Sequence, residues 1–201
     1  MRKRRPIIIL LLLPAVLALV LPARPALAAR FLALYSAILR NDLAAVRQLT
    51  PGAGAINQVD RSTGATPLTW AAMHGIRPEI TRWLLSRGAD REKPDGEGNT
   101  PLTTAACYGN TGVVKVLLEA GADPNAADKQ GRHPLVVASG RRGRIEILEA
   151  LVKAGVAVQG LIGSHALEMA LACGRKDLVA YLESLGARPS YFREIKRFYQ
   201  E

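Results

Sequence analysis

The sequence predicts an all-α solenoid of stacked helix-turn-helix repeats, and three observations support this fold class. First, Thr66-Pro67-Leu68 recurs as Thr100-Pro101-Leu102 after 34 residues and as His133-Pro134-Leu135 after 33 more. Second, a glycine stands two residues before each copy. Third, each copy begins a pair of apolar helical segments that are separated by a glycine. A fixed period of this size indicates units that bury their apolar faces against their neighbours.

Five repeats can be placed on this register, and each joins an inner helix to an outer helix. Pro67 suits the first turn of an inner helix, where its missing N–H removes no hydrogen bond, and Thr66 before it is a good N-cap. In the first repeat Asn41 takes the place of the helix-ending glycine. The expected repeats span about residues 30–62, 63–96, 97–129, 130–162 and 163–188.

The fourth and fifth repeats depart from this pattern. His133 and His165 stand where the other repeats have threonine, and we interpret both imidazoles as helix caps. The fourth repeat also holds one extra residue before Gly143, the glycine expected to end its inner helix. The extra residue falls at Arg141-Arg142, and an irregular loop on a regular frame favours a functional role there.

The C-terminal segment 190–201 is expected to form a short capping helix, because the open end of a solenoid must be covered. Its apolar residues fall on one broad face of a helix. The alternative is an aromatic peptide that is offered to a partner. These apolar residues are Tyr191, Phe192, Ile195, Phe198 and Tyr199.

The first 28 residues predict a secretory signal peptide. A basic cluster at residues 2–5 precedes an apolar run over residues 7–21, and Ala26-Leu27-Ala28 offers the small residues of a cleavage site. The run of about 15 residues is shorter than the roughly 20 that cross a bilayer as a helix, which disfavours an uncleaved membrane anchor. We therefore expect a signal peptide over residues 1–28 and a mature domain over residues 29–201, exported to the periplasm or secreted.

Cleavage also changes the charge of the chain. The formal net charge is +10, and residues 1–28 carry five basic residues and no acid, so the mature chain carries +5. Nucleic-acid-binding domains show a concentrated basic stripe, which this remainder does not provide. We therefore expect no binding of nucleic acid. We also expect a monomer.

The repeats resemble the ankyrin family. The resemblance is carried by the Thr-Pro-Leu copies, by the alanine pairs Ala71-Ala72 and Ala105-Ala106, and by the Gly-Ala steps at Gly88-Ala89 and Gly121-Ala122. It implies a non-catalytic protein-interaction module. With the signal peptide, the chain is similar to exported periplasmic ankyrin proteins linked to oxidative-stress defence. That similarity implies an adaptor, protector or inhibitor of a partner protein.

Signatures of catalysis and cofactor binding are absent from the sequence. It contains no Gly-x-Ser-x-Gly nucleophile motif and no glycine-rich phosphate loop. Two histidines, His133 and His165, supply fewer ligands than a catalytic zinc site needs. We therefore expect no enzyme activity, metal or cofactor. The alternative is a metal-binding protein or an enzyme that uses the His133/His165 region. Cys107 and Cys173 lie two repeats apart, too far for a disulfide, so both thiols are expected to be unpaired.

The expected partner-binding surface combines the turn tips with the exposed ends of the inner helices, as the ankyrin resemblance implies. Its basic residues, joined by Arg144, favour an acidic patch on a partner protein or an anionic lipid head group. Trp70 and Trp83 take positions that are expected to be core. The candidate residues are Arg61, Ser62, Ala65, Gly96, Glu97, Asn99, Lys129, Gln130 and Arg132 at the tips, and Met73, His74, Cys107, Tyr108, Arg141 and Arg142 at the helix ends.

Overall fold

The computed structural model describes residues 25–50, 53–74 and 78–190, and every regular element in these ranges is a helix. Ten of the helices form five pairs in chain order, which confirms the predicted fold class. A short helix, α4 (Ala53–Ile56), follows the first pair. The pairs are α2 (Pro25–Leu39) with α3 (Leu43–Leu49), α5 (Pro67–His74) with α6 (Pro78–Ser86), α7 (Pro101–Tyr108) with α8 (Thr111–Glu119), α9 (Pro134–Ala138) with α10 (Ile145–Lys153), and α11 (Leu161–Ala172) with α12 (Lys176–Ser184).

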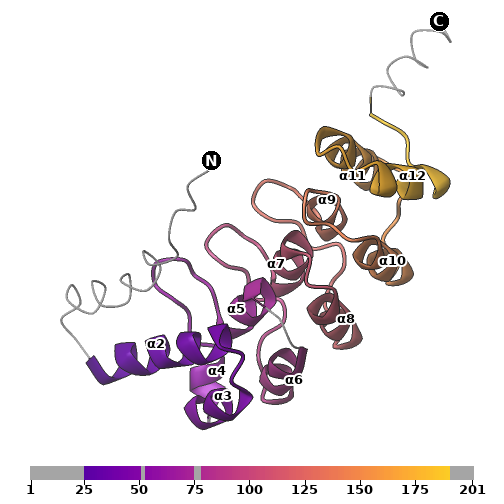
Figure 1. Cartoon of the computed structure of the whole chain (residues 1–201). Helices are drawn as coiled ribbons and strands as arrows, with labels where there is room; N and C mark the ends of the chain where they lie inside the picture. Colours follow the sequence, from indigo (N-terminus) through magenta and orange to yellow (C-terminus); the bar gives the residue numbers. More distant parts are fainter. Residues whose placement is uncertain (1–24, 51–52, 75–77, 191–201) are drawn as a thin grey trace, which may run out of the picture.

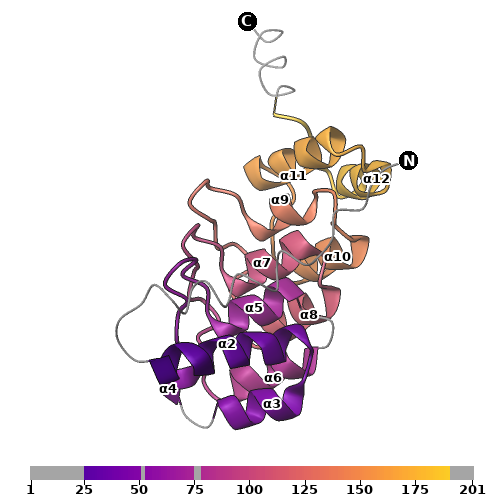
Figure 2. The same cartoon turned by 60° about the vertical axis from the view of Figure 1, so that its left-hand side comes forward.

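The helices form two parallel rows. In the inner row α5 packs against α2 and α7, and α9 packs against α7 and α11. In the outer row α6 lies between α3 and α8, and α10 lies between α8 and α12 (Figure 1). The long loops that join one pair to the next project beyond the inner row (Figure 2). Each repeat therefore packs mainly against its neighbours, as in a solenoid.

The leucine of the repeated tripeptide supplies the centre of the core. Leu68, Leu102 and Leu135 are fully buried, and so is Leu167 at the equivalent place in the last repeat. Because these leucines take the same place in successive repeats, they form a continuous apolar line through the stack. Burying one leucine side chain stabilises the fold by about 2 kcal/mol. Trp70 is buried as predicted. Trp83 is half-buried at the edge of this core, where its indole N–H donates to the Thr50 hydroxyl at 3.2 Å.

Local residues begin and end the helices where the sequence predicts. The Thr66 and Thr100 hydroxyls accept hydrogen bonds from the backbone N–H of Thr69 and Thr103, at 3.1 and 3.2 Å. Proline follows each threonine in the first turn of the helix. Asn41 has a φ of 56° and ends α2 in the left-handed conformation that glycine adopts in other repeats. Gly75, the expected end of α5, lies outside the described residues.

Three expectations for the fourth and fifth repeats are wrong. Helix α9 ends at Ala138, so Gly143 does not end it. The ring of His133 makes no capping bond to α9, because its Nδ1 atom pairs with the Asn125 carbonyl at 2.7 Å. His165 is exposed within α11 and so does not cap this helix. Because α11 begins at Leu161, the last repeat begins in the turn before residue 161 rather than at residue 163.

The loop tips are built around one aspartate in each of three repeats. The carboxylates of Asp60, Asp95 and Asp128 accept the backbone N–H two residues further on, at 3.1, 2.9 and 2.9 Å. Adjacent tips are also joined to each other. The Gly96 N–H donates to the Thr63 carbonyl at 2.7 Å, and the Lys129 N–H donates to the Glu97 carbonyl at 3.2 Å. Backbone hydrogen bonds thus fix the spacing of the tips.

Several expectations for the chain ends concern residues that the structure does not describe. The apolar run at residues 7–21 and the C-terminal segment 191–201 lie outside the described residues. The expected cleavage after Ala28 falls in the first turn of α2. Among the helices of the described ranges, none is both long and apolar enough to cross a membrane.

Cys107 and Cys173 are both free thiols, as predicted.

Asp128 provides a test of the tip geometry, because its carboxylate is buried and accepts three hydrogen bonds, one from Gln130 and two from Arg132. Burial acts to raise the pKa of Asp128, but the hydrogen bonds from Arg132 and Gln130 outweigh burial and hold the pKa below its ordinary value. A lowered pKa stabilises the fold above the unfolded-state value of about 4, and this contribution is lost as the pH falls through the folded-state pKa.

Asp128→Ala is therefore expected to lower the free energy of unfolding at pH 7 by about 2 kcal/mol, the scale of bonds to a charged group. Urea unfolding between pH 7 and pH 2 should show the difference from the parent shrinking below about pH 4. Arg132→Ala removes the guanidinium but keeps the backbone N–H bonds, so it should reproduce only part of the loss. Equal stability of Asp128→Ala and the parent at pH 7 would contradict the role of the carboxylate.

Candidate partner-binding surface

Only some of the candidate tip residues are exposed to solvent. Arg61, Ser62, Glu97 and Gln130 are exposed as predicted, as are Gly96, Lys129 and Arg132. Asn99 is half-buried, and its amide donates to the Asp95 carboxylate at 3.2 and 3.3 Å. Ala65 is 3% exposed and belongs to the core, so its expected role at the surface is wrong. The tip offers less side-chain surface than motif position alone indicates.

The basic residues at the third tip are engaged in the structure of the tip itself. The Lys129 ammonium donates to the Gly96 carbonyl at 2.6 Å. The Arg132 guanidinium donates to the buried Asp128 carboxylate at 2.7 Å. Both cations are therefore held by internal partners, which weakens the case that they supply the charge for a partner.

Met73 and His74 lie half-buried at the end of α5. The His74 ring meets the ring of Tyr35 edge-on, with centroids 6.2 Å apart. Its Nε2 atom is buried without a hydrogen-bond partner, and burial lowers the pKa of His74. Because a lowered histidine pKa favours the neutral form at pH 7, His74 adds an apolar and aromatic surface rather than a charge.

The turn at residues 140–143, named here the arginine turn, replaces the helix end that other repeats have. The Gly143 N–H closes it by donating to the Gly140 carbonyl at 3.0 Å. A Cβ atom at Gly143 would collide with the Ala138 carbonyl, so only glycine allows this close approach. The turn leaves Arg141 and Arg142 exposed on its outer side.

Arg175 from the next repeat holds the arginine turn in place. Its Nη1 atom donates to the carbonyls of Gly143 at 2.6 Å and Arg141 at 3.2 Å, and reaches that of Gly140 at 3.5 Å. Its other two nitrogens donate to the Asp177 carboxylate at 3.0 and 2.7 Å. This two-point pairing fixes the plane of the guanidinium. The turn is thus held in a defined shape by a residue more than 30 positions away in the sequence.

Tyr108 connects the arginine turn to the end of α7. The Arg142 guanidinium lies over the Tyr108 ring, 5.1 Å from its centroid, in a cation–π contact. Tyr108 is 38% exposed, so the ring and the cation form one surface beside the exposed Cys107 and Arg141. Predicted helix-end residues from two repeats are therefore brought together here.

Sequence reasoning missed Arg175, although one signal could have found it. Arg175 directly follows Gly174, and the equivalent residue in the third repeat is Asn110. The Asn110 amide donates to the Ala72 and Met73 carbonyls of the preceding repeat, at 2.5 and 3.1 Å. The residue after the helix-ending glycine thus reaches back to the preceding repeat in both cases.

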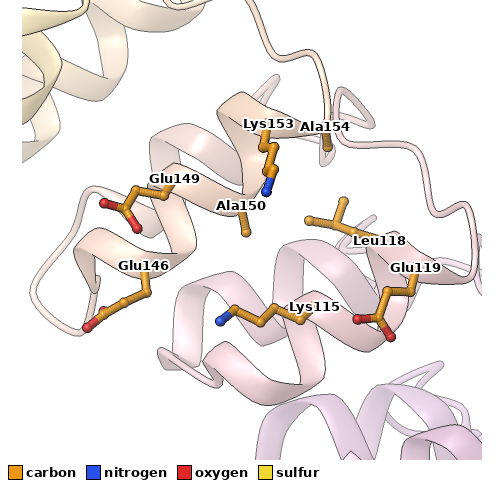
Figure 3. Close-up of a pocket in the computed structure, with 8 residues that line it drawn as sticks. All are labelled: Lys115, Leu118, Glu119, Glu146, Glu149, Ala150, Lys153 and Ala154. Atoms are coloured by element: carbon orange, nitrogen blue, oxygen red, sulfur yellow. The ribbon is translucent and has the colours of Figure 1, made fainter.

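A shallow groove of about 490 Å³ lies in the outer row, between α8 and α10. Lys115 and Leu118 on α8 face Ala150 and Lys153 on α10 across the groove (Figure 3). Three glutamates share its lining, so both positive and negative side chains line the groove. The groove therefore differs in charge from the arginine turn. The glutamates are Glu119, Glu146 and Glu149.

The described part of the chain holds no group of three or more histidine, cysteine, aspartate or glutamate side chains that could bind a metal. His133 is engaged with the Asn125 carbonyl, and His165 lies on the exposed face of α11.

Residues 34–128 match the family model of ankyrin repeats, in three copies. The matched stretch begins within α2 and extends through α8, and α9 to α12 continue both rows beyond it. The fold is an ankyrin repeat solenoid. Ankyrin repeats mediate protein–protein interactions, through the extended surfaces that a solenoid presents.

Three curated relatives match parts of this chain. Neurogenic locus notch homolog protein 1 of Xenopus tropicalis is 36% identical over 133 residues, which are 65% of this chain and 5% of that protein. Protein phosphatase 1 regulatory subunit 27 of Mus musculus is 41% identical over 69 residues, 34% of this chain and 44% of that protein. Palmitoyltransferase Hip14 of Drosophila melanogaster is 39% identical over 79 residues, 39% of this chain and 12% of that protein. The match thus spans less than half the length of each relative.

Arg175→Ala is expected to loosen the arginine turn while the ankyrin stack stays folded. Losing bonds from a charged group costs about 1.5 kcal/mol, so trypsin should cleave after Arg141 and Arg142 roughly tenfold faster. The measurement is the rate of cleavage at these two bonds, followed by mass spectrometry.

Lys176→Ala is the matched control, because Lys176 is exposed and adjacent to Arg175. It should leave the cleavage rate at the turn unchanged. If Arg175→Ala and the parent were cleaved there at the same rate, the turn would not depend on Arg175.

Proposed function

We propose that this protein is an exported protein-interaction module that acts as an adaptor, protector or inhibitor of a partner protein. Its ankyrin fold supports the class, because ankyrin repeats mediate protein–protein interactions. The binding surface joins Tyr108, Arg141 and Arg142, and its partner carries an acidic patch. The role is one of binding rather than catalysis.

The observation that carries this proposal is the shape of the arginine turn. An exposed arginine normally loses side-chain entropy when a partner binds it. Here the backbone below Arg141 is held by Arg175, and Arg142 is already placed over the Tyr108 ring. Pre-organisation of this kind reduces the ordering that binding requires. Arginine and tyrosine are also the residue types that contribute most at the centres of protein interfaces.

Charge supports an acidic partner. Lys129 and Arg132 are held by internal partners, whereas Arg141 and Arg142 are directed outward from a fixed turn, and Arg144 beside them is exposed. Three exposed arginines within four positions attract carboxylates and speed the encounter with them. A partner protein with an acidic patch therefore fits this surface better than an uncharged one.

The export of the protein is proposed from the first 28 residues. The basic cluster, the apolar run and Ala26-Leu27-Ala28 match the order of parts in a signal peptide. Export would bring the repeats into the periplasm or the medium.

The double variant Arg141→Glu/Arg142→Glu tests the binding surface. Affinity capture from a periplasmic extract of the source organism should recover the partner with the parent, and roughly tenfold less of it with the variant. Lys115→Glu/Lys153→Glu is the control, because it makes the same change in net charge in the groove between α8 and α10. Circular dichroism should show that both variants are folded. Equal recovery with the parent and with Arg141→Glu/Arg142→Glu would contradict the proposed surface.

N-terminal sequencing of the mature protein tests export. The expected sequence begins at Ala29, and the protein should be released with the periplasmic fraction. A protein that begins at Met1 and stays with the membrane fraction would instead support an uncleaved anchor.

A further inference from the structure

His74 is a titratable side chain that the arginine turn does not use. It is the last residue of α5, and its ring is half-buried. The Nε2 atom of this ring is buried, and no described residue forms a hydrogen bond with it. Because buried polar atoms usually have a partner, an imidazole without one needs a physical explanation.

Aromatic rings form part of the contact between the first repeat and the second, where α2 packs against α5 (Figure 2). The Trp70 ring of α5 has its centroid 4.6 Å from those of Phe31 and Tyr35 on α2. The His74 ring, one helical turn after Trp70, meets the other side of this cluster at Tyr35, with centroids 6.2 Å apart. Trp70 is only 6% exposed. His74 therefore stands at the edge of an apolar contact that joins the first repeat to the second.

The helices that pack against α5 offer the His74 ring no ion pair within the described part of the chain. On α2, Arg30 donates to the Leu49 carbonyl at 3.2 Å. The pKa of Tyr35 is raised, by burial first and by the Asp60 carboxylate second, so the Tyr35 hydroxyl stays neutral. A charge on the imidazole would thus be buried without a counter-ion. The other titratable side chains on these helices are exposed, namely Glu79 and Arg82 on α6 and Cys107 and Tyr108 on α7.

The site suits a neutral imidazole and disfavours the cation, because burying an unpaired charge is costly. Burial accordingly lowers the pKa of His74 below its ordinary value of about 6.5. The stability that the neutral ring gives to this contact is fully present above about pH 6.5, and it is lost as the pH falls toward the folded-state pKa. A protonated ring can regain water only by turning outward, which breaks its contact with Tyr35.

We propose that protonation of His74 weakens the packing of α2 on α5, so that the first repeat detaches more readily in acid and uncovers Trp70. The first repeat is the natural place for such a change, because α2 packs on the inner row from one side only, whereas α5 and α7 lie between two neighbours. An element with fewer neighbours opens at a lower free-energy cost than the rest of a stack. His74 would make that opening sensitive to pH.

Hydrogen exchange of the purified full-length protein at pH 7.5 and pH 5.5 tests this proposal, with the rates corrected for the intrinsic effect of pH. Backbone protection in α2 should fall roughly tenfold at pH 5.5, which is one unit below the ordinary histidine pKa. Protection in α8, in the middle of the stack, should stay unchanged. In His74→Phe the ring cannot take a charge, so protection in α2 should be the same at both pH values.

His74→Gln separates the effect of charge from that of an added ring, because glutamine is neutral as well and should also make protection in α2 independent of pH. His165→Gln is the matched control, since His165 is exposed on α11 and its loss should leave the tenfold change intact. A fall in α2 protection that persists in either His74 variant would overturn the proposal. So would a fall that α8 shares in full, because the whole stack would then lose stability rather than the first repeat.

Discussion

The structure depends on the close approach of successive inner helices. Ala72 and Ala106 are fully buried where one repeat meets the next, and their small side chains leave room for the neighbouring helix. A single pair of helices could not bury its apolar faces alone, so every repeat relies on the ones beside it. The capping threonines and the bonded tips then fix how each pair is oriented. The stacking of the inner helices also brings their ends into line, and this places the exposed residues of successive repeats next to one another.

The periodic features of the fold could be predicted from the sequence because single residues determine them. Proline after threonine begins an inner helix, and Asn41 tolerates the left-handed conformation that ends α2. The errors concern the fourth and fifth repeats. The close packing of Gly143 against Ala138 and the early start of α11 depend on contacts that no local pattern records.

The candidate surface was predictable in position but not in its bonding. Motif position correctly placed Tyr108 at the exposed end of α7, whereas Arg141 is exposed in the turn that follows α9. It could not distinguish Arg142, which lies over the Tyr108 ring, from Arg132, which binds a buried carboxylate. It also missed Arg175, since the carbonyls that Arg175 binds belong to another repeat. The sequence gives the sign of the charge on a surface, whereas the structure shows which of those charges are already paired within the protein.

The way the arginine turn is built separates the stability of the fold from the identity of the exposed side chains. Gly143 and backbone carbonyls determine the shape of the turn, and the bonds from Arg175 go to backbone carbonyls, including that of Arg141, rather than to the Arg141 side chain. Residue 141 can therefore change in the course of evolution with little effect on folding. This arrangement resembles the use of variable loops on a constant scaffold, and it allows recognition to diverge while the ankyrin stack is retained.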